Sequence, residues 1–461
     1  MRMSTVCCDM RTELDTRSAF GIVLIAVLWL GCRLWLDFPG LPTTDTIRQL
    51  NEGLSGCYTN WKPTLYSWQL GTLNRVFPGN GVTACYVIQT LGFALSVAGI
   101  AWYYARRNRR YALLVLVLPL FFTVKGMLVS TVGNDEQAAA CYLLYIAGVL
   151  HASDVPQERR VLRWWITGAS FIILGYGLVL RHNAIPAVFV LSCWGGWKLG
   201  VRKIWYCVLG ALAFLAVSHT VNGVLSYRVL KAEASYPLRS PLVDDVVNLS
   251  ILDGEWHPIV YEFEDRENLE PPYKRCIYAP ETGNWNSPIN PYTLYPDVAL
   301  RKRDYEMLKQ AWWDMVTRHP ERYLLTKAFF FHQFLLEGRV IPLLCEKLRE
   351  SYPHIRIHME KESADWRAWV NREFLVMSCI PLGAYLLVLA CCSRRVRQMV
   401  CAFPERLDSL FFMLVAFLYT GSFFFLVLSA TEQRYYVIRA SLCCVGVGLF
   451  VLSLVRGRKQ R

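Results

Sequence analysis

The sequence predicts an all-α membrane protein that crosses the bilayer about ten times and carries one mixed external domain. Two observations predict this fold class. The chain of 461 residues is 54% hydrophobic and only 18% charged, whereas soluble proteins carry about 25% charged residues. The apolar residues also gather in blocks of about 20, the length that a helix needs to cross about 30 Å of hydrocarbon.

We expect ten spans, and they lie at residues 19–36, 83–104, 111–130, 136–151, 164–180, 184–200, 204–224, 373–392, 408–430 and 435–455. Five connectors between or after these spans are rich in Arg and Lys; they lie at residues 106–110, 158–163, 198–203, 394–397 and 456–461. All five fall on one side of the membrane if both termini are cytoplasmic. The net charge of +13 therefore reflects membrane topology and not nucleic-acid binding. We expect a multi-pass protein of the cell inner membrane.

This topology divides the chain into four parts. Residues 1–18 form a cytoplasmic N-terminus, and residues 19–224 form a seven-helix module with an external loop at 37–80. Residues 225–372 form an external, periplasmic domain with a helix at 304–319. Residues 373–461 hold three more spans and a basic cytoplasmic tail.

The apolar segment 323–344 is predicted to lie in the outer interface and not to cross. It carries four ionisable residues, namely Lys327, His332, Glu337 and Arg339. A crossing there would also move the later basic connectors to the outside, against the positive-inside rule. An interfacial helix agrees with both observations.

The first candidate site is the loop after span one. If a helix begins at Asp45, then Asp45, Gln49 and Glu52 share one face. Such a face can present a carboxylate to a substrate as a general base. The alternative is that Asp45 or Thr46 only caps the helix.

The second site closes the same loop, at Asn60-Trp61-Lys62-Pro63. Lys62 at the outer membrane surface can hold a phosphate as a point charge. The alternative is an interfacial anchor, in which Trp61 joins the aromatic belt and Lys62 extends along apolar surface into water.

The third site is the external turn between spans three and four, where Asp135 and Glu136 are adjacent. They could supply a second acid that faces the first loop. Alternatively, they could be a pair of ligands for a divalent metal; whether the protein needs a metal is left open. Carboxylates at a helix start are favoured by the helix dipole in any case, which is the structural alternative.

The fourth site consists of external basic residues. Arg181-His182 and Arg434-Tyr435 stand at span ends on the side that the positive-inside rule disfavours. Arginine suits bidentate phosphate binding, and an ion pair with a nearby carboxylate is the alternative. The sequence contains no Walker loop, no dinucleotide-binding fingerprint, no His/Cys metal-ligand spacing and no internal repeat.

The order and sidedness of these motifs resemble the GT-C superfamily of polytopic membrane glycosyltransferases, which use polyprenyl-phosphate sugars. The resemblance is architectural along most of the chain and local at a few motifs. It lies in the acid after span one, the Trp61-x-Pro63 segment, the second acidic turn, Arg181-x-Asn183, His319-Pro320-x-x-Tyr323 and Arg434-Tyr435-Tyr436. Asn60 and Lys62 depart from the Asp and His of the usual bacterial segment.

The resemblance implies a GT-C-like fold and an inverting transferase. The enzyme would move a sugar from a polyprenyl-phosphate donor to a glycan, lipid or protein acceptor on the external face. Asp45 would act as the base, with Asp135 and Glu136 as further acids. Lys62, Arg181, His182, Arg434 and Tyr435 would bind the donor phosphate. The alternatives are a polysaccharide polymerase or O-antigen ligase, in which Asp45 is unimportant, and a lipid or glycan transporter.

Overall fold

The protein is described by a computed structural model over residues 16–106, 131–236, 298–324 and 404–426, and at positions 238, 242, 245, 246, 249, 327, 442, 445, 446 and 449. The described residues are mostly helical. The longer helices are α1 (Thr16–Asp37), α2 (Thr44–Ser55), α3 (Thr64–Val76), α4 (Gly81–Ala105), α6 (Asn134–Asp154), α7 (Arg160–Leu180), α8 (Ile185–Lys198), α9 (Ile204–Gly223), α14 (Val298–Arg318) and α19 (Pro404–Leu426). The short elements are β1 (Leu41–Pro42), β2 (Thr131–Val132), η2 (Gln157–Arg159), η3 (His182–Ala184) and the π-helix η4 (Val224–Val229).

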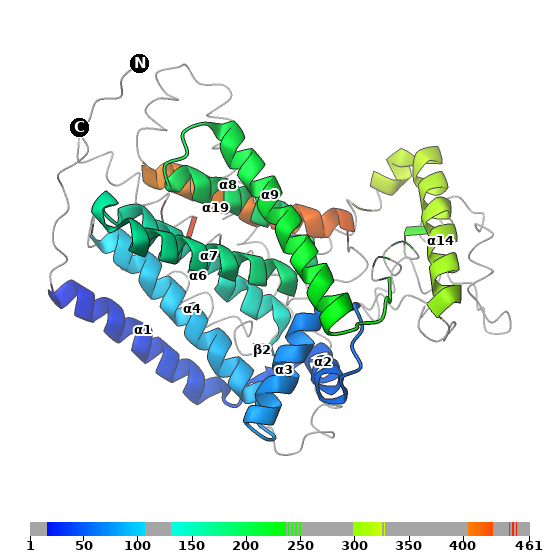
Figure 1. The fold of residues 1–461 in the computed structure, drawn as a ribbon, viewed down its shortest axis with the longest axis horizontal. Coiled ribbons are helices and arrows are strands. Elements are labelled where there is room, and N and C mark those ends of the chain that lie inside the picture. The colour runs from blue at the N-terminus through cyan, green and yellow to red at the C-terminus, as the bar shows by residue number, and fades with distance from the viewer. Residues whose placement is uncertain are drawn as a thin grey trace.

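Helices α1, α4, α6, α7, α8, α9 and α19 pack side by side as a bundle, and α14 lies apart from it (Figure 1). Helix α1 packs on α4, α4 on α6 and α6 on α7, while α8 packs on α9 and α19. Buried tyrosines join neighbouring helices, because a phenol in an apolar interior needs a hydrogen-bond acceptor. The Tyr142 hydroxyl donates to the Gly177 carbonyl oxygen at 3.0 Å, and Tyr145 donates to the Leu191 carbonyl oxygen at 3.0 Å.

Four described helices are long and apolar enough to cross a membrane; they are Phe20–Asp37, Gly81–Ala105, Gln157–Leu180 and Ile204–Val229. They coincide with four predicted spans, so the chain is a helical protein with the character of a membrane protein. Helices α6, α8 and α19 cover three further predicted spans. The predicted spans 111–130 and 373–392 lie outside the described residues, and 435–455 is described at four positions only. The total of ten spans stays a prediction.

A buried carboxylate ties three helices together at the end of the bundle where α4 and α8 finish. Asp408 of α19 is 1% exposed and pairs with the Lys198 ammonium at 2.7 Å. Its oxygens also accept hydrogen bonds from Tyr104 of α4 and Trp194 of α8, each at 2.9 Å. Since every partner comes from another helix, this cluster fixes α19 against the first half of the chain.

Several of the basic connectors meet at this same end of the bundle. Arg106, after α4, lies 3.9 Å from Asp154 at the end of α6. Arg163 of α7 donates to the carbonyl oxygen of Leu199, just after α8, at 2.6 Å. Arg106 and the connectors at 158–163 and 198–203, which the sequence assigns to one side of the membrane, are thus at the same end of the described bundle.

The first external loop is folded into two helices, α2 and α3, that cross at glycines. A Cβ added at Gly53 would collide with the backbone of Ser67 and Gly71, and one added at Gly71 would collide with Gly53. Arg75 of α3 donates to the Gly53 carbonyl oxygen at 2.9 Å. The two backbones touch, so the residues of α2 are held firmly relative to α3.

The predicted helix at 304–319 is confirmed, and it begins six residues earlier, as α14. Asp245 and Lys327 form a buried ion pair of 2.5 Å beside it. Trp312 of α14 donates to the second Asp245 oxygen at 3.0 Å, and its ring meets Tyr323 edge-on at 5.9 Å. Apart from residues 323, 324 and 327, the segment 323–344 lies outside the described residues.

Candidate functional site

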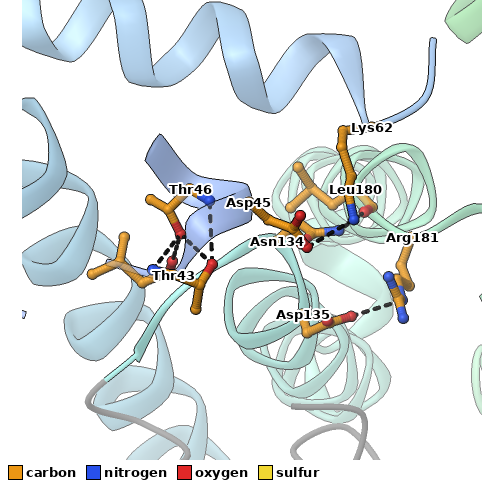
Figure 2. A network of polar contacts seen from close by, with 9 residues as sticks. Thr43, Asp45, Thr46, Lys62, Asn134, Asp135, Leu180 and Arg181 are labelled. Atoms are coloured by element: carbon orange, nitrogen blue, oxygen red, sulfur yellow. Dashed lines mark hydrogen bonds and ion pairs between the residues drawn. The ribbon is translucent and has the colours of Figure 1, made fainter. Parts of the chain in front are cut away.

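Two loops that the sequence places at the same end of the spans are joined by a short parallel bridge. Leu41 pairs with Thr131 and Pro42 pairs with Val132. The Thr46 hydroxyl donates to the Val132 carbonyl oxygen in the same place (Figure 2). The bridge brings the start of α2 next to the start of α6, and therefore Asp45 into the neighbourhood of Asp135.

Helix α2 is capped by Thr43 and not by Asp45. The Thr43 side chain accepts from the Thr46 N–H at 3.2 Å, and the Thr46 hydroxyl accepts from the Thr43 N–H at 3.1 Å, which is a capping box. The expectation that Asp45 or Thr46 is the capping residue is wrong, because the N-cap is Thr43 and Thr46 takes part as the third residue of the helix. Asp45 lies in the first turn with its carboxylate directed elsewhere.

The partner of Asp45 is Lys62, the cation predicted in the second site. The Lys62 ammonium lies 2.7 Å from Oδ2 of Asp45, and the two side chains are 18% and 22% exposed (Figure 2). Two candidate residues that are 17 positions apart in the chain thus form one ion pair at the edge of the bundle. The pair is therefore in contact with water.

The predicted shared face of Asp45, Gln49 and Glu52 is turned toward the end of the same loop. The Glu52 carboxylate accepts hydrogen bonds from Thr59 at 2.8 Å and from Ser67 at 2.9 Å. Glu52 is buried and serves to hold α2 against α3. Gln49 is 1% exposed, and its amide has no hydrogen-bond partner among the described residues.

Asn60, the first departure from the usual family segment, has a structural function. Its side-chain N–H donates to the Tyr227 hydroxyl at 2.7 Å. Its side-chain oxygen accepts from both the N–H and the hydroxyl of Ser235, at 2.6 and 2.7 Å. The backbone N–H of Asn60 donates to the Glu233 carbonyl oxygen at 3.0 Å. An amide side chain can donate from its nitrogen and accept at its oxygen, as these contacts require. The contacts fix the segment that carries Lys62.

A second ion pair lies beside the first. Asp135, 1% exposed, lies 2.7 Å from Nε of Arg181, whose side chain is 14% exposed (Figure 2). Asn134 of the same turn donates to the Leu180 carbonyl oxygen at 3.0 Å, which holds the end of α7 against the start of α6. Asp135 precedes the apolar stretch of α6. Burial raises the pKa of its carboxyl, and the positive charges of Arg181 and Lys62 oppose this rise.

Glu136 is buried next to Asp135, and its carboxylate covers Gly133 so closely that a Cβ at Gly133 would collide with it. One residue further along α6, polar side chains of α3, α6 and α7 are hydrogen-bonded to one another. The amides of Gln69 and Gln137 exchange bonds of 3.3 and 3.2 Å, and Gln137 donates to the Tyr176 hydroxyl at 3.2 Å. This network supports the start of α6, which carries both acids.

His182 does not join Arg181 at the ion pairs. It lines an open cavity of about 300 Å³ between the ends of α7 and α9 and the start of α8. Leu178, Val179, Ile185, Leu215 and Ala216 form the apolar part of the lining, and Ser218, His219 and Asn222 the polar part. Sequence reasoning missed His219 and Asn222, because their alignment with His182 depends on how α9 packs.

Arg434 and Tyr435 lie outside the described residues. Within the described residues, no group of three or more His, Cys, Asp or Glu side chains is arranged to hold a metal ion. Comparison of the chain with models of known protein families, with curated proteins and with solved structures finds no match.

Proposed function

We propose that the protein is a GT-C-like membrane glycosyltransferase that moves a sugar from a polyprenyl-phosphate donor to a glycan, lipid or protein acceptor outside the cell membrane. One observation carries the proposal. Asp45–Lys62 and Asp135–Arg181, two acid–base pairs from three separate connectors, lie together at one end of an apolar helical bundle. A lipid-linked phosphate sugar needs this combination of cations, an accessible carboxylate and an adjoining bilayer.

The chemistry is a single displacement. Asp45 removes the proton of the acceptor hydroxyl, whose oxygen forms a new bond to the anomeric carbon of the donor sugar. The bond from that carbon to the phosphate oxygen breaks, and its electron pair leaves with polyprenyl phosphate. Attack from the face opposite the leaving group inverts the anomeric centre. The positive charges of Lys62 and Arg181 stabilise the charge that develops on the phosphate.

The accessibility of the two acids supports different roles. Asp45 is 22% exposed, so an acceptor hydroxyl can approach it. Asp135 is almost wholly buried and bound to Arg181, which suits a residue that positions the guanidinium. Glu136, also buried, stabilises the turn from which Asp135 projects.

The surroundings favour a lipid-linked donor over a soluble one. Side chains of α7 and α9, the helices that flank Arg181 and His182, are apolar and exposed, for example Ile172 at 74% and Val217 at 62%. Such faces are stable in contact with lipid tails. The cavity beside His182 gives an apolar chain a place next to the cation site.

The test is transfer by purified full-length protein in lipid nanodiscs. The donors would be polyprenyl phosphates bearing different pentoses or hexoses, and the release of polyprenyl phosphate would be measured. Asp45→Asn keeps the shape of the side chain and removes the base, so turnover should fall by about 10²-fold or more. Glu158→Gln, exposed at the far end of the bundle, is the charge-matched control and should retain full turnover. Normal transfer by well-folded Asp45→Asn would favour the polymerase or ligase alternative.

A further inference from the structure

Both cations of the site are bound to carboxylates in the absence of a substrate. The Lys62 ammonium and the Arg181 guanidinium each lie 2.7 Å from an aspartate oxygen. Phosphate oxygens seek the same donors that these aspartates use. A phosphate that enters the site therefore meets two cations that are already paired with carboxylates.

The two pairs differ in how readily they can open. Asp135 is 1% exposed, and loss of its cation would leave a charge buried without compensation, which is strongly unfavourable. Asp45 and Lys62 are each about one fifth exposed, so water can solvate either partner when they separate. Lys62 also acts electrostatically on Asp135, so its charge is felt by both carboxylates.

The two cations also differ in the number of anions that each can bind at once. The guanidinium has five N–H donors in a rigid fork, and the contact with Asp135 through Nε does not exhaust them. A guanidinium can in this way contact two anions at once, so phosphate binding does not require Arg181 to leave Asp135. The ammonium of Lys62 is a point charge on a flexible chain, which can turn from one anion to another.

We propose, on the basis of the proposed function, that Lys62 exchanges partners during the reaction. In the free protein it holds the Asp45 carboxylate. When the donor phosphate binds, Lys62 moves to the phosphate and Asp45 becomes available to the acceptor hydroxyl. Arg181 stays bound to Asp135 throughout. The base is thus exposed only when a donor is in place, which protects the site from unproductive proton transfer.

This exchange predicts opposite effects of two similar substitutions on phosphate binding. The probe is dodecyl phosphate, added to full-length protein in phosphatidylcholine nanodiscs, with the dissociation constant measured by calorimetry. Asp45→Asn removes the competitor for Lys62 and should tighten binding about fivefold or more. Asp135→Asn removes the residue that orients Arg181 and should weaken binding by a similar factor.

A double-mutant cycle tests whether the tighter phosphate binding of Asp45→Asn comes from Lys62. Lys62→Met should weaken binding and Lys62→Arg should restore much of it. In the Lys62→Met background, Asp45→Asn should have no further effect, because the competition concerns Lys62 alone. The control Glu158→Gln should leave the dissociation constant unchanged. Inorganic phosphate should bind more weakly than dodecyl phosphate, and equal affinity would overturn the assignment to a lipid phosphate.

The exchange and the proposed function fail in different ways. If Asp45→Asn abolishes sugar transfer but does not tighten phosphate binding, the exchange is wrong and the transferase proposal stands. If Asp45→Asn binds the phosphate more tightly and still transfers sugar normally, Asp45 is not the base, and the exchange, which frees that base, falls as well. If the wild-type protein binds the phosphate but releases no polyprenyl phosphate from any donor, the transferase proposal is wrong. A gain in affinity that persists without Lys62 would also overturn the exchange.

Discussion

Thr46 and Val132 stand 86 positions apart in the chain, and the hydroxyl of the first donates a hydrogen bond to the carbonyl oxygen of the second. The same hydroxyl closes the capping box of α2 by accepting from the Thr43 N–H. One small side chain thus sets both the start of α2 and its position against the second loop.

We therefore expect Thr46→Val to weaken both the fold and the site. The substitution keeps the volume and removes the hydroxyl, so the protein should lose about 1–2 kcal/mol of stability and a larger share of its turnover. Thermal unfolding and sugar transfer would be measured in the same preparation. The control is Thr220→Val on α9, where an exposed hydroxyl bonds only within its own helix. Equal behaviour of the two variants would argue against the link between the loops.

Asn60→Asp should reduce transfer even though it introduces the residue of the usual family segment. An aspartate cannot donate to the Tyr227 hydroxyl, so the bond that Asn60 donates is lost and the hydroxyl must turn to donate in its place. We expect turnover to fall about tenfold, because Lys62 lies two residues further along and a small displacement of a catalytic group is costly. Tyr227→Phe removes the same hydrogen bond from the other side and should give a similar loss. Activity of Asn60→Asp at or above that of the wild type would contradict a structural function for Asn60.

Asp408→Asn should destabilise the bundle without changing the site. Lys198, whose side chain is 9% exposed, would keep its charge and lose its counter-ion, at a cost of about 3–5 kcal/mol. We expect the melting temperature in detergent to fall by about 5–10 °C. The double variant Asp408→Asn with Lys198→Met removes the uncompensated charge and should recover part of the loss. A melting temperature no higher for the double variant than for the single one would show that the ion pair is not the cause.

Cys57 offers a natural reporter of sidedness. It is exposed and free, between α2 and the segment that holds Lys62. If the site faces outward, a membrane-impermeant maleimide should label Cys57 in intact cells. Labelling should fall in Cys57→Ser, while reporter fusions after Arg110 and Glu281 should give opposite sidedness. Labelling of Cys57 only after the cells are permeabilised would invert the predicted topology.

The sequence predicted the helical spans that the structure describes, because hydrophobic length is a strong local signal. It also singled out Asp45, Lys62, Asp135 and Arg181, each from its position at a span end. Their pairing could not be predicted, since it depends on the bridge between β1 and β2. Two residues per strand are too short to leave a periodic pattern in the sequence.

The sequence also could not predict the roles of residues that lie close to these four in the chain. Glu52 follows Asp45 on the same face, yet it is hydrogen-bonded to Thr59 and Ser67. His182 follows Arg181 and lines a cavity instead of the ion pairs. Spacing along a helix predicts the face on which a residue lies. Which other segment packs against that face depends on the tertiary structure.

The bond that Asn60 donates to Glu233 and the bond that it accepts from Ser235 also impose an order on biosynthesis. The first loop emerges early, but the residues that fix it are made only after α9 and η4. Until residues 233 and 235 have been synthesised, the loop lacks the hydrogen bonds that hold Asn60. A ribosome that stalls before residue 235, or a fragment that ends there, would deliver the acids and cations of the site without the frame that sets their distances.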